Sequence, residues 1–269
     1  MRVAIQGERG SYSEEAAIQF FGAVDVVACR WFDDAFAEIA AGRADCGVIP
    51  IENSQAGSIN DTYDLLLQHD LPIVGEVDLP VRHCLLALPG VPLAEVRRVY
   101  SHPQALAQCE EFIARIGAEK VAAEDTAGSA RLLRAHGWRD AAAIASARAG
   151  ELYGLDRLAE GIQTNANNRT RFVVLSPKPL PDGGRPAASG YKTSMVFVTP
   201  NTPGSLYHCL GVLATRGINL VKIESRPYRP KPWDYVFYVD FDGHTADGPI
   251  RDALDDLRSR AQFLKILGS

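Results

Sequence analysis

A threonine flanked by two arginines stands just before an apolar run, in the stretch ANNRTRFVVL that covers residues 166–175. Arginine binds a carboxylate through two parallel hydrogen bonds, which lysine cannot copy. A hydroxyl between the arginines can donate to a substrate oxygen on which negative charge develops. The stretch is therefore typical of an anion site with Thr170 at its centre, or of a solvated turn at the mouth of a strand.

The alternation of side chains along a strand restrains the first interpretation. Neighbouring residues point to opposite faces, so Arg169 and Arg171 share one face and Thr170 takes the other. If Thr170 faces a ligand, at least one arginine is structural. The residues alone leave open which arginine contacts a substrate.

Five other segments place small polar residues where a strand ends and a helix opens: GERGSYS, PIENSQAGS, SHPQAL, EDTAGSA and IASARAG. Helix N-termini carry unpaired N–H groups and partial positive charge, so they attract anions. Each Ser or Thr alone reads as a helix cap, but five together favour a shared pocket. The predicted ligand-binding residues are Asn53, Ser54, Ser101, His102, Gln104, Thr126, Ser146, Asn168, Arg171 and Phe172.

Three residues near these segments have less certain roles. His102 could act as an acid or a base, as histidines often do, but a local hydrogen bond at a helix start is the preferred interpretation. Glu52 follows the apolar GVIPI, so it either pairs with an arginine, acts as a base or is a buried structural carboxylate. His83 lacks metal-ligand spacing and is expected to belong to a strand. GERG lacks the G-x-G-x-x-G pattern and no P-loop lysine occurs, so nucleotide binding is poorly supported.

The whole chain of 269 residues has a formal net charge of -5, so its surface should not attract nucleic acid or acidic membranes. Its five cysteines are odd in number and widely spaced, which argues against a disulfide framework or a zinc site and favours a reducing compartment. The N-terminus reads as a strand, and no apolar run reaches membrane length. These features predict a cytoplasmic protein.

Strands and helices alternate twice along residues 1–176, which predicts an α/β region of two lobes, with a crossover near 80–95 and a return near 170. The stretch SPKPLPDGGRPAASG is rich in proline and glycine, so residues 177–190 are predicted to be a linker. Residues 191–269 follow the order βαββαβ, which is ferredoxin-like.

The chain resembles the monofunctional prephenate dehydratases that end in an ACT regulatory domain. The resemblance covers essentially the full length through GVIPIENSQAGSI, SHPQALAQC, DTAGSA, AAIAS, NRTRFVVL, NTPGSLYHCLGVLATRGINLVKIESRP and WDYVFYVDFDGH. Any one motif is weak, but their number and order make the resemblance specific. The resemblance implies a two-lobed catalytic region like the periplasmic binding proteins and an ACT domain.

The resemblance also implies an activity: prephenate loses carbon dioxide and its ring hydroxyl to give phenylpyruvate in phenylalanine biosynthesis, with no metal or organic cofactor. Thr170 matches the family's essential threonine. L-phenylalanine is expected as an allosteric effector, and the subunits as homodimers or homotetramers with paired ACT domains. The predicted phenylalanine-binding residues are Asn201, Pro203, Gly204, Leu206, Asn219, Glu224, Ser225 and Arg226.

Two departures from the family pattern bear on these expectations. Thr164 stands where the family often has an aspartate, and GSLY at 204–207 replaces the bacterial G-A-L-V motif. One alternative is arogenate dehydratase, acting on the amino analogue of prephenate. The other is a non-catalytic amino-acid sensor. For a dehydratase, we expect Thr170 to donate to the leaving hydroxyl, and Arg171 and the helix-start N–H groups to hold the carboxylates.

Overall fold

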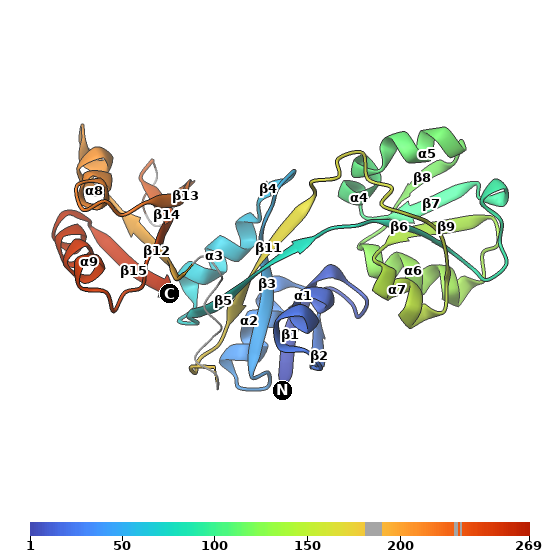
Figure 1. Cartoon of the computed structure of the whole chain (residues 1–269), viewed down its shortest axis with the longest axis horizontal. Coiled ribbons are helices and arrows are strands. Elements are labelled where there is room, and N and C mark those ends of the chain that lie inside the picture. The colour runs from blue at the N-terminus through green and yellow to red at the C-terminus, as the bar shows by residue number, and fades with distance from the viewer. Residues whose placement is uncertain (181–189, 229–230, 232) are drawn as a thin grey trace. The chain divides into compact units, whose positions relative to one another are not determined.

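A computed structural model describes residues 1–180, 190–228, 231 and 233–269 (Figure 1). The chain forms two compact units: the first comprises residues 1–62 and 77–174, the second residues 63–76 and 175–269. The division after residue 174 lies close to the expected boundary at 176. The assignment of residues 63–76 to the second unit was not expected. Of the expected linker, residues 181–189 lie outside the described part of the chain.

The first lobe of the first unit is built on a sheet with the strand order β5-β11-β3-β1-β2 (Figure 1). Strand β1 pairs in parallel with both β2 and β3, and β4 forms a short antiparallel hairpin with β3. The elements are β1 (Arg2–Gln6), α1 (Tyr12–Phe21), β2 (Asp25–Cys29), α2 (Phe32–Ala40), β3 (Cys46–Asn53), β4 (Gly57–Ser58), α3 (Asn60–Gln68), β5 (Ile73–Pro80) and β11 (Arg169–Leu175).

Helix α1 begins at Ser11, whose hydroxyl accepts a hydrogen bond from the Glu14 backbone N–H at 3.4 Å. Ser11 and Glu14 have the S-x-x-E spacing of a capping box, but only the serine half of the box forms. The buried Glu14 carboxylate accepts from the backbone N–H of Gly10, not of Ser11, and it pairs with Arg148 at 3.2 Å. A buried carboxylate needs such partners, and these lie before the cap and on the second lobe.

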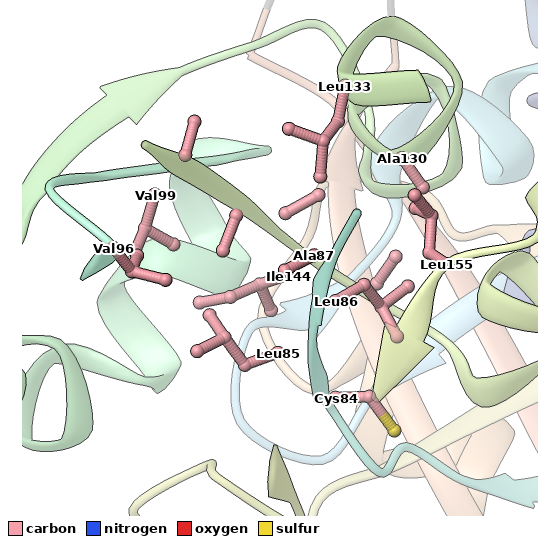
Figure 2. Packing of buried hydrophobic residues seen from close by; sticks show 14 of the residues in the cluster. Cys84, Leu85, Leu86, Ala87, Val96, Val99, Ala130, Leu133, Ile144 and Leu155 are labelled. Atoms are coloured by element: carbon pink, nitrogen blue, oxygen red, sulfur yellow. The ribbon is translucent and has the colours of Figure 1, made fainter. Parts of the chain in front are cut away.

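The second lobe has the strand order β10-β6-β9-β7-β8, with β7 parallel to β8 and β9, and β6 antiparallel to β9 and β10. Its elements are β6 (Cys84–Ala87), the 3₁₀ turn η1 (Leu93–Glu95), β7 (Arg98–Ser101), α4 (Pro103–Gln108), α5 (Glu110–Ile116), β8 (Glu119–Ala122), α6 (Thr126–His136), β9 (Ala141–Ala145), α7 (Ala147–Tyr153) and β10 (Asp156–Glu160). Figure 2 shows the core, where Leu85, Leu86 and Ile144 are fully buried.

The stretch PQALAQCEEFIARIG forms two helices rather than one, although no proline or glycine interrupts it between its two ends. Cys109 leaves helical geometry with a φ of -110° and ends α4 where α5 begins. The chain enters the second lobe through residues 81–83 and returns through residues 161–168 to β11. The expected two-lobed α/β architecture is confirmed.

The second unit contains β12 (Lys192–Val198), α8 (Ser205–Ala214), β13 (Leu220–Pro227), β14 (Tyr235–Asp242), α9 (Gly248–Arg260) and β15 (Phe263–Gly268). This is the predicted βαββαβ order, in a sheet ordered β13-β14-β12-β15 whose paired strands are antiparallel. Met195, Phe197 and Phe241 lie in its core. No helix within the described residues has the length and apolarity needed to cross a membrane.

The later turns of α3 belong to this second unit because their contacts lie there. The Tyr238 hydroxyl donates to the Tyr63 carbonyl at 2.9 Å, and Arg226 pairs with Asp64 at 3.2 Å. Strand β15 also meets the start of β5, where Gly268 is the partner of Ile73.

Candidate active site

A pocket of about 430 Å³ lies in the first unit, where the loops that follow β1, β3, β7 and β8 converge on the start of β11. In α/β folds, ligands bind beyond the carboxyl ends of the strands, which is where these loops lie. The pocket is lined by Gln6, Gly7, Ser11, Tyr12, Ser13, Phe32, Pro50, Asn53, Ile59, Val81, His83, His102, Gln104, Ala105, Gln108, Glu124, Asp125, Thr126, Thr170 and Phe172.

Thr170 lies in the wall of this pocket with 9% of its surface exposed. Its Oγ1 accepts a hydrogen bond from the Asn53 side-chain Nδ2 at 3.0 Å. An amide nitrogen only donates, so the Thr170 hydroxyl must be the acceptor in this bond. Among the described residues, no acceptor takes the hydrogen of the Thr170 hydroxyl. That hydrogen is therefore available to a ligand.

The orientation of the Asn53 amide is fixed by the backbone around it. Its Oδ1 accepts from the backbone N–H groups of Gln55 and Ala56, each at 3.0 Å. Its Nδ2 therefore points the other way, toward Asn168 Oδ1 at 2.9 Å and toward Thr170 Oγ1 and the Arg169 carbonyl, each at 3.0 Å. The turn after β3 thus sets which end of the amide meets the threonine.

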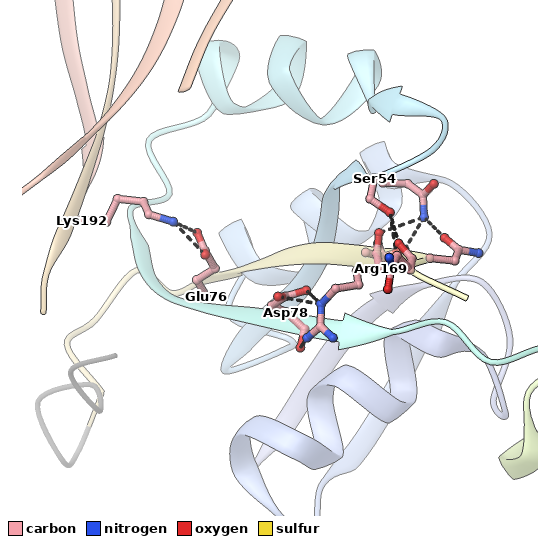
Figure 3. Close-up of polar contacts among 9 residues, drawn as sticks. Ser54, Glu76, Asp78, Arg169 and Lys192 are labelled. Carbon is pink, nitrogen blue, oxygen red and sulfur yellow. Dashed lines mark hydrogen bonds and ion pairs between the residues drawn. The ribbon is translucent and has the colours of Figure 1, made fainter. Parts of the chain in front are cut away.

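Both arginines beside Thr170 pair with carboxylates and lie outside the pocket lining. Arg169 contacts Asp78 at 2.9 Å, and its backbone N–H donates to the Ser54 hydroxyl at 3.0 Å (Figure 3). Arg171 Nε lies 3.6 Å from a Glu52 carboxylate oxygen. This placement follows the alternation along β11, and it removes the geometric basis for Arg171 as a substrate ligand. Of the roles considered for Glu52, the structure shows the arginine pair.

Six of the predicted site residues line the pocket together: Asn53, His102, Gln104, Thr126, Thr170 and Phe172. His102 caps α4, where its Nδ1 accepts from the Gln104 backbone N–H at 3.2 Å. The preferred local interpretation of His102 is therefore confirmed. Asp125, rather than Thr126, caps α6, because its carboxylate accepts from the Gly128 backbone N–H.

The other predicted hydroxyl and amide residues are outside the lining and hydrogen-bond locally. The fully buried Ser101 hydroxyl donates to the Ile144 carbonyl at 2.7 Å, and the Ser146 hydroxyl donates to the Gly10 carbonyl at 2.7 Å. Ser54 donates to the Asn167 carbonyl at 3.0 Å. Ser101 and Ser146 are buried, and a buried hydroxyl needs a hydrogen-bond partner, which a backbone carbonyl supplies in both cases. Asn168 Oδ1 accepts a hydrogen bond from Asn53 Nδ2 at 2.9 Å and so helps to hold the Asn53 amide in place.

Among the lining residues that the sequence-based prediction did not name, Tyr12, His83 and Gln108 form one hydrogen-bonded group. His83 is 2% exposed and lies between the other two, with Nδ1 2.9 Å from the Tyr12 hydroxyl and Nε2 2.8 Å from Gln108 Oε1. Burial lowers the pKa of His83, because the charged imidazolium is poorly solvated there. Tyr12 falls in the GERGSYS segment but was not singled out there. His83 was expected in a strand, which is wrong, because it lies in the connection between β5 and β6.

The charged residues in the lining are acidic. Glu124 pairs with Arg30 at 2.8 Å, and burial raises the pKa of the Asp125 carboxyl, partly offset by its hydrogen bond from the Gly128 N–H. No arginine or lysine contributes to the pocket wall within the described residues. An anionic ligand here would be held by neutral donors.

The second unit has its own pocket of about 380 Å³, lined by Thr199, Pro200, Asn201, Thr202, Gly204, Ser205, Leu206, Tyr207, Trp233, Asp234, Tyr235 and Phe237. Three predicted effector-binding residues, Asn201, Gly204 and Leu206, are among them. The other five are not: Pro203, Asn219, Glu224, Ser225 and Arg226. Asn219 donates to Asp242 at 2.9 Å. Arg226 pairs with Asp64.

Comparisons with known proteins agree with this architecture. A sequence model described as prephenate dehydratase matches residues 3–180, and one described as ACT domain matches residues 193–259. The chain is 47% identical over 278 residues to arogenate dehydratase/prephenate dehydratase 2, chloroplastic, of Arabidopsis thaliana, covering 100% of this chain and 72% of that protein.

Two solved structures are also similar over the whole chain. GqqA, described as a novel type of quorum quenching acylase, has a TM-score of 0.90 and 36% identity, and 97% of it is covered. A prephenate dehydratase in complex with L-Phe from Arthrobacter aurescens has a TM-score of 0.86 and 33% identity, and 89% of it is covered.

Proposed function

This chain belongs to the prephenate dehydratase family of carbon–oxygen lyases, and we propose that it converts prephenate to phenylpyruvate by decarboxylating dehydration. One observation carries the mechanism: in the pocket wall, Thr170 accepts from Asn53 and keeps its own hydrogen for a ligand. A hydroxyl held in this way is a preorganised donor, which stabilises charge only where charge develops.

The reaction needs such a donor at the departing oxygen. The prephenate dianion loses carbon dioxide and the ring hydroxyl together, and the electron pair of the broken carboxyl bond completes the aromatic ring. The hydroxyl departs with negative charge and takes up one proton to leave as water. Thr170 stabilises that charge through a hydrogen bond, while the solvent supplies the net proton. Aromatisation drives the reaction, so the enzyme only has to lower the barrier.

Neutral donors suit the two substrate carboxylates. The lining offers the side-chain amide of Gln104 and the backbone at the start of α6, near Thr126. One carboxylate must leave as carbon dioxide, so an arginine pair on it would stabilise the ground state and raise the barrier. Phe172, 1% exposed, contributes an apolar wall.

Replacing the hydroxyl tests this role directly. Thr170→Val removes the donor while keeping the side-chain shape, and we expect kcat to fall by ~10²–10³, the usual effect of losing one such donor. Thr170→Ser keeps the hydroxyl and should retain most of the turnover. Phenylpyruvate formation, followed spectroscopically, measures both. Wild-type turnover by Thr170→Val would reject the mechanism, and a wild-type chain that makes no product would favour the non-catalytic sensor.

Arogenate is the second candidate substrate. The relatives named above include an arogenate dehydratase/prephenate dehydratase, and the pocket carries Glu124 and Asp125, whose carboxylates would attract the ammonium group of arogenate. Comparing kcat/KM for the two substrates distinguishes them. If arogenate is preferred, Asp125→Asn should lower kcat/KM for arogenate more than for prephenate.

Acyl hydrolysis, the activity in the description of one solved relative, requires a nucleophile activated by a base. In the described part of the pocket, His83 bonds to Tyr12 and Gln108, and His102 bonds to a backbone N–H. Neither of these two imidazoles is hydrogen-bonded to a serine among the residues that the structure describes. The arrangement therefore favours dehydration.

We also propose that L-phenylalanine regulates the enzyme through the second unit, because a similar solved structure is described with L-Phe bound and Asn201, Gly204 and Leu206 surround a pocket here. Calorimetric titration with phenylalanine, with Gly204→Val as a blocking variant, tests the site.

A homodimer or homotetramer is also proposed, and light scattering measures which of the two forms. A cytoplasmic location is proposed from cysteine usage, whereas the relative of Arabidopsis thaliana is named chloroplastic, so fractionation of the source cells decides it.

A further inference from the structure

A continuous row of hydrogen bonds runs through the pocket wall behind Thr170. It connects Tyr12, His83, Gln108, Asn168, Asn53 and Thr170. The distances along it are 2.9, 2.8, 3.0, 2.9 and 3.0 Å. Asn168 and His83 are 1% and 2% exposed, so solvent cannot readily replace a lost partner.

The direction of each hydrogen bond in the row follows from the orientation of the Asn53 amide, which backbone N–H groups fix. Two backbone N–H groups hold Asn53 Oδ1, so Asn53 Nδ2 must donate to Asn168 Oδ1. The other end of the Asn168 amide, Nδ2, then donates to Gln108 Oε1.

Gln108 Oε1 faces His83 Nε2 as well. An amide oxygen only accepts, so His83 Nε2 must carry a hydrogen. Its burial keeps the imidazole neutral, so Nδ1 is left as an acceptor. The Tyr12 hydroxyl lies 2.9 Å from this Nδ1 and 3.0 Å from the Arg82 carbonyl, and its one hydrogen points to this pair of acceptors. The tautomer of His83 is thereby specified by a turn at the other end of the row.

We infer that His83, held by Tyr12, is a positioning residue whose Nε2–H keeps Gln108, Asn168 and Asn53 oriented so that Thr170 offers its hydrogen to the substrate. This inference rests on the proposed dehydration. With the opposite tautomer, Gln108 would turn its amide nitrogen toward Asn168 Nδ2, and two donors would meet. Asn168 would turn in response and place a donor against Asn53 Nδ2, which moves the Asn53 amide away from Thr170.

A pair of substitutions separates this role from simple packing. In His83→Gln the new amide nitrogen stands near the position of Nε2 and still donates to Gln108. In His83→Asn the shorter amide reaches the position of Nδ1 and leaves Gln108 without that donor. We expect His83→Asn to lower kcat about tenfold, as the loss of one hydrogen bond of about 1.4 kcal/mol implies, with KM within about twofold. His83→Gln should keep kcat within about threefold of the wild type.

Cys84→Ala serves as the packing control, because Cys84 is fully buried next to His83 but is not part of the pocket lining. We expect wild-type kcat for this variant. Equal kcat for the two His83 variants, or a change confined to KM, would overturn the inference. A low kcat in Cys84→Ala would do the same, because it would show that packing disturbance alone is sufficient.

The tautomer is testable without catalysis. Nitrogen-15 NMR of the imidazoles in the full wild-type chain, assigned with His83→Gln, should show His83 neutral with the hydrogen on Nε2 at pH about 7. A hydrogen on Nδ1 would contradict the row. If the wild type turns over neither prephenate nor arogenate, the proposed function fails, and the NMR result still supports or refutes the hydrogen-bond row.

Discussion

A buried imidazole in the pocket wall couples the stability of this protein to pH. Burial lowers the pKa of His83 in the folded chain, whereas the unfolded chain has the ordinary value of about 6.5. As pH falls through that value, the unfolded state takes up a proton that the folded state resists. The unfolded state then binds more protons, so the free energy of unfolding decreases toward acid pH. The effect ends once the pH is below the folded pKa.

His83→Gln should remove this contribution, since glutamine does not titrate. We expect the wild type to lose more of its free energy of unfolding than the variant does between pH about 7.5 and about 5.5. Urea denaturation at several pH values measures the difference between the two slopes, which cancels the other titrating groups. Parallel slopes would mean that His83 is accessible to protons in the folded state.

At the residue scale, the sequence located the threonine but not the residues that orient it. Thr170 stood out because its neighbours are unusual, and alternation along the strand already set it opposite Arg169 and Arg171. Its partner Asn53 ends β3, 117 residues earlier, and local patterns cannot reveal which end of the Asn53 amide meets the threonine. His83 was missed for a related reason, since a lone histidine becomes informative only when its neighbours in space are known.

At the element scale, a glycine joins the two lobes of the first unit. Gly10, in the loop between β1 and α1, has a φ of +85°, and a Cβ there would lie 2.9 Å from the Cα of Ala149 in α7. Its carbonyl accepts from the Ser146 hydroxyl at the start of the same helix. The loop can approach α7 so closely only because residue 10 has no side chain.

Gly10→Ala should therefore destabilise the first unit by about 2–4 kcal/mol, from the positive φ and the steric overlap together. Gly22→Ala is the matched control, because Gly22 ends α1 with a φ of +78° and a Cβ added there would meet no atom within 4 Å. It should cost less, about 1–2 kcal/mol, because only the positive φ acts there. Urea unfolding of both variants measures the difference, and similar losses would show that the contact with Ala149 relaxes freely.

Element order was more predictable than element ends. Strand–helix alternation reflects periods of hydrophobicity that any burial requires, so both lobes and the βαββαβ order followed from it. The break at Cys109 was hidden because the sequence there has no proline or glycine, and the apolar pattern continues across it. The capping box at Ser11 does not form completely, because the Glu14 carboxylate binds the Gly10 N–H and Arg148, which lie outside its own helix.

At the scale of the whole molecule, all five cysteines are free and buried. Burial raises the pKa of the Cys29 thiol to about 11 and those of Cys46 and Cys109 to about 12, so almost none of these thiols ionise at neutral pH. We expect negligible reaction with a thiol-specific chromogenic disulfide in the native state and five equivalents after denaturation. Rapid labelling of the native protein would show that an interior segment opens readily.

The boundary between the two units passes through helix α3. The amino-acid composition there is not that of a linker, so the sequence does not predict this boundary. The Thr62 hydroxyl of α3 donates to the Pro50 carbonyl of β3, whereas the carbonyl of its neighbour Tyr63 accepts a hydrogen bond from the Tyr238 hydroxyl. A protein shortened at the proline-rich segment would thus keep residues 63–76 but lose what they were folded against, and Asp64 would be left without its guanidinium partner. A chimera that takes its C-terminal domain from a relative therefore has to take residues 63–76 from that relative as well.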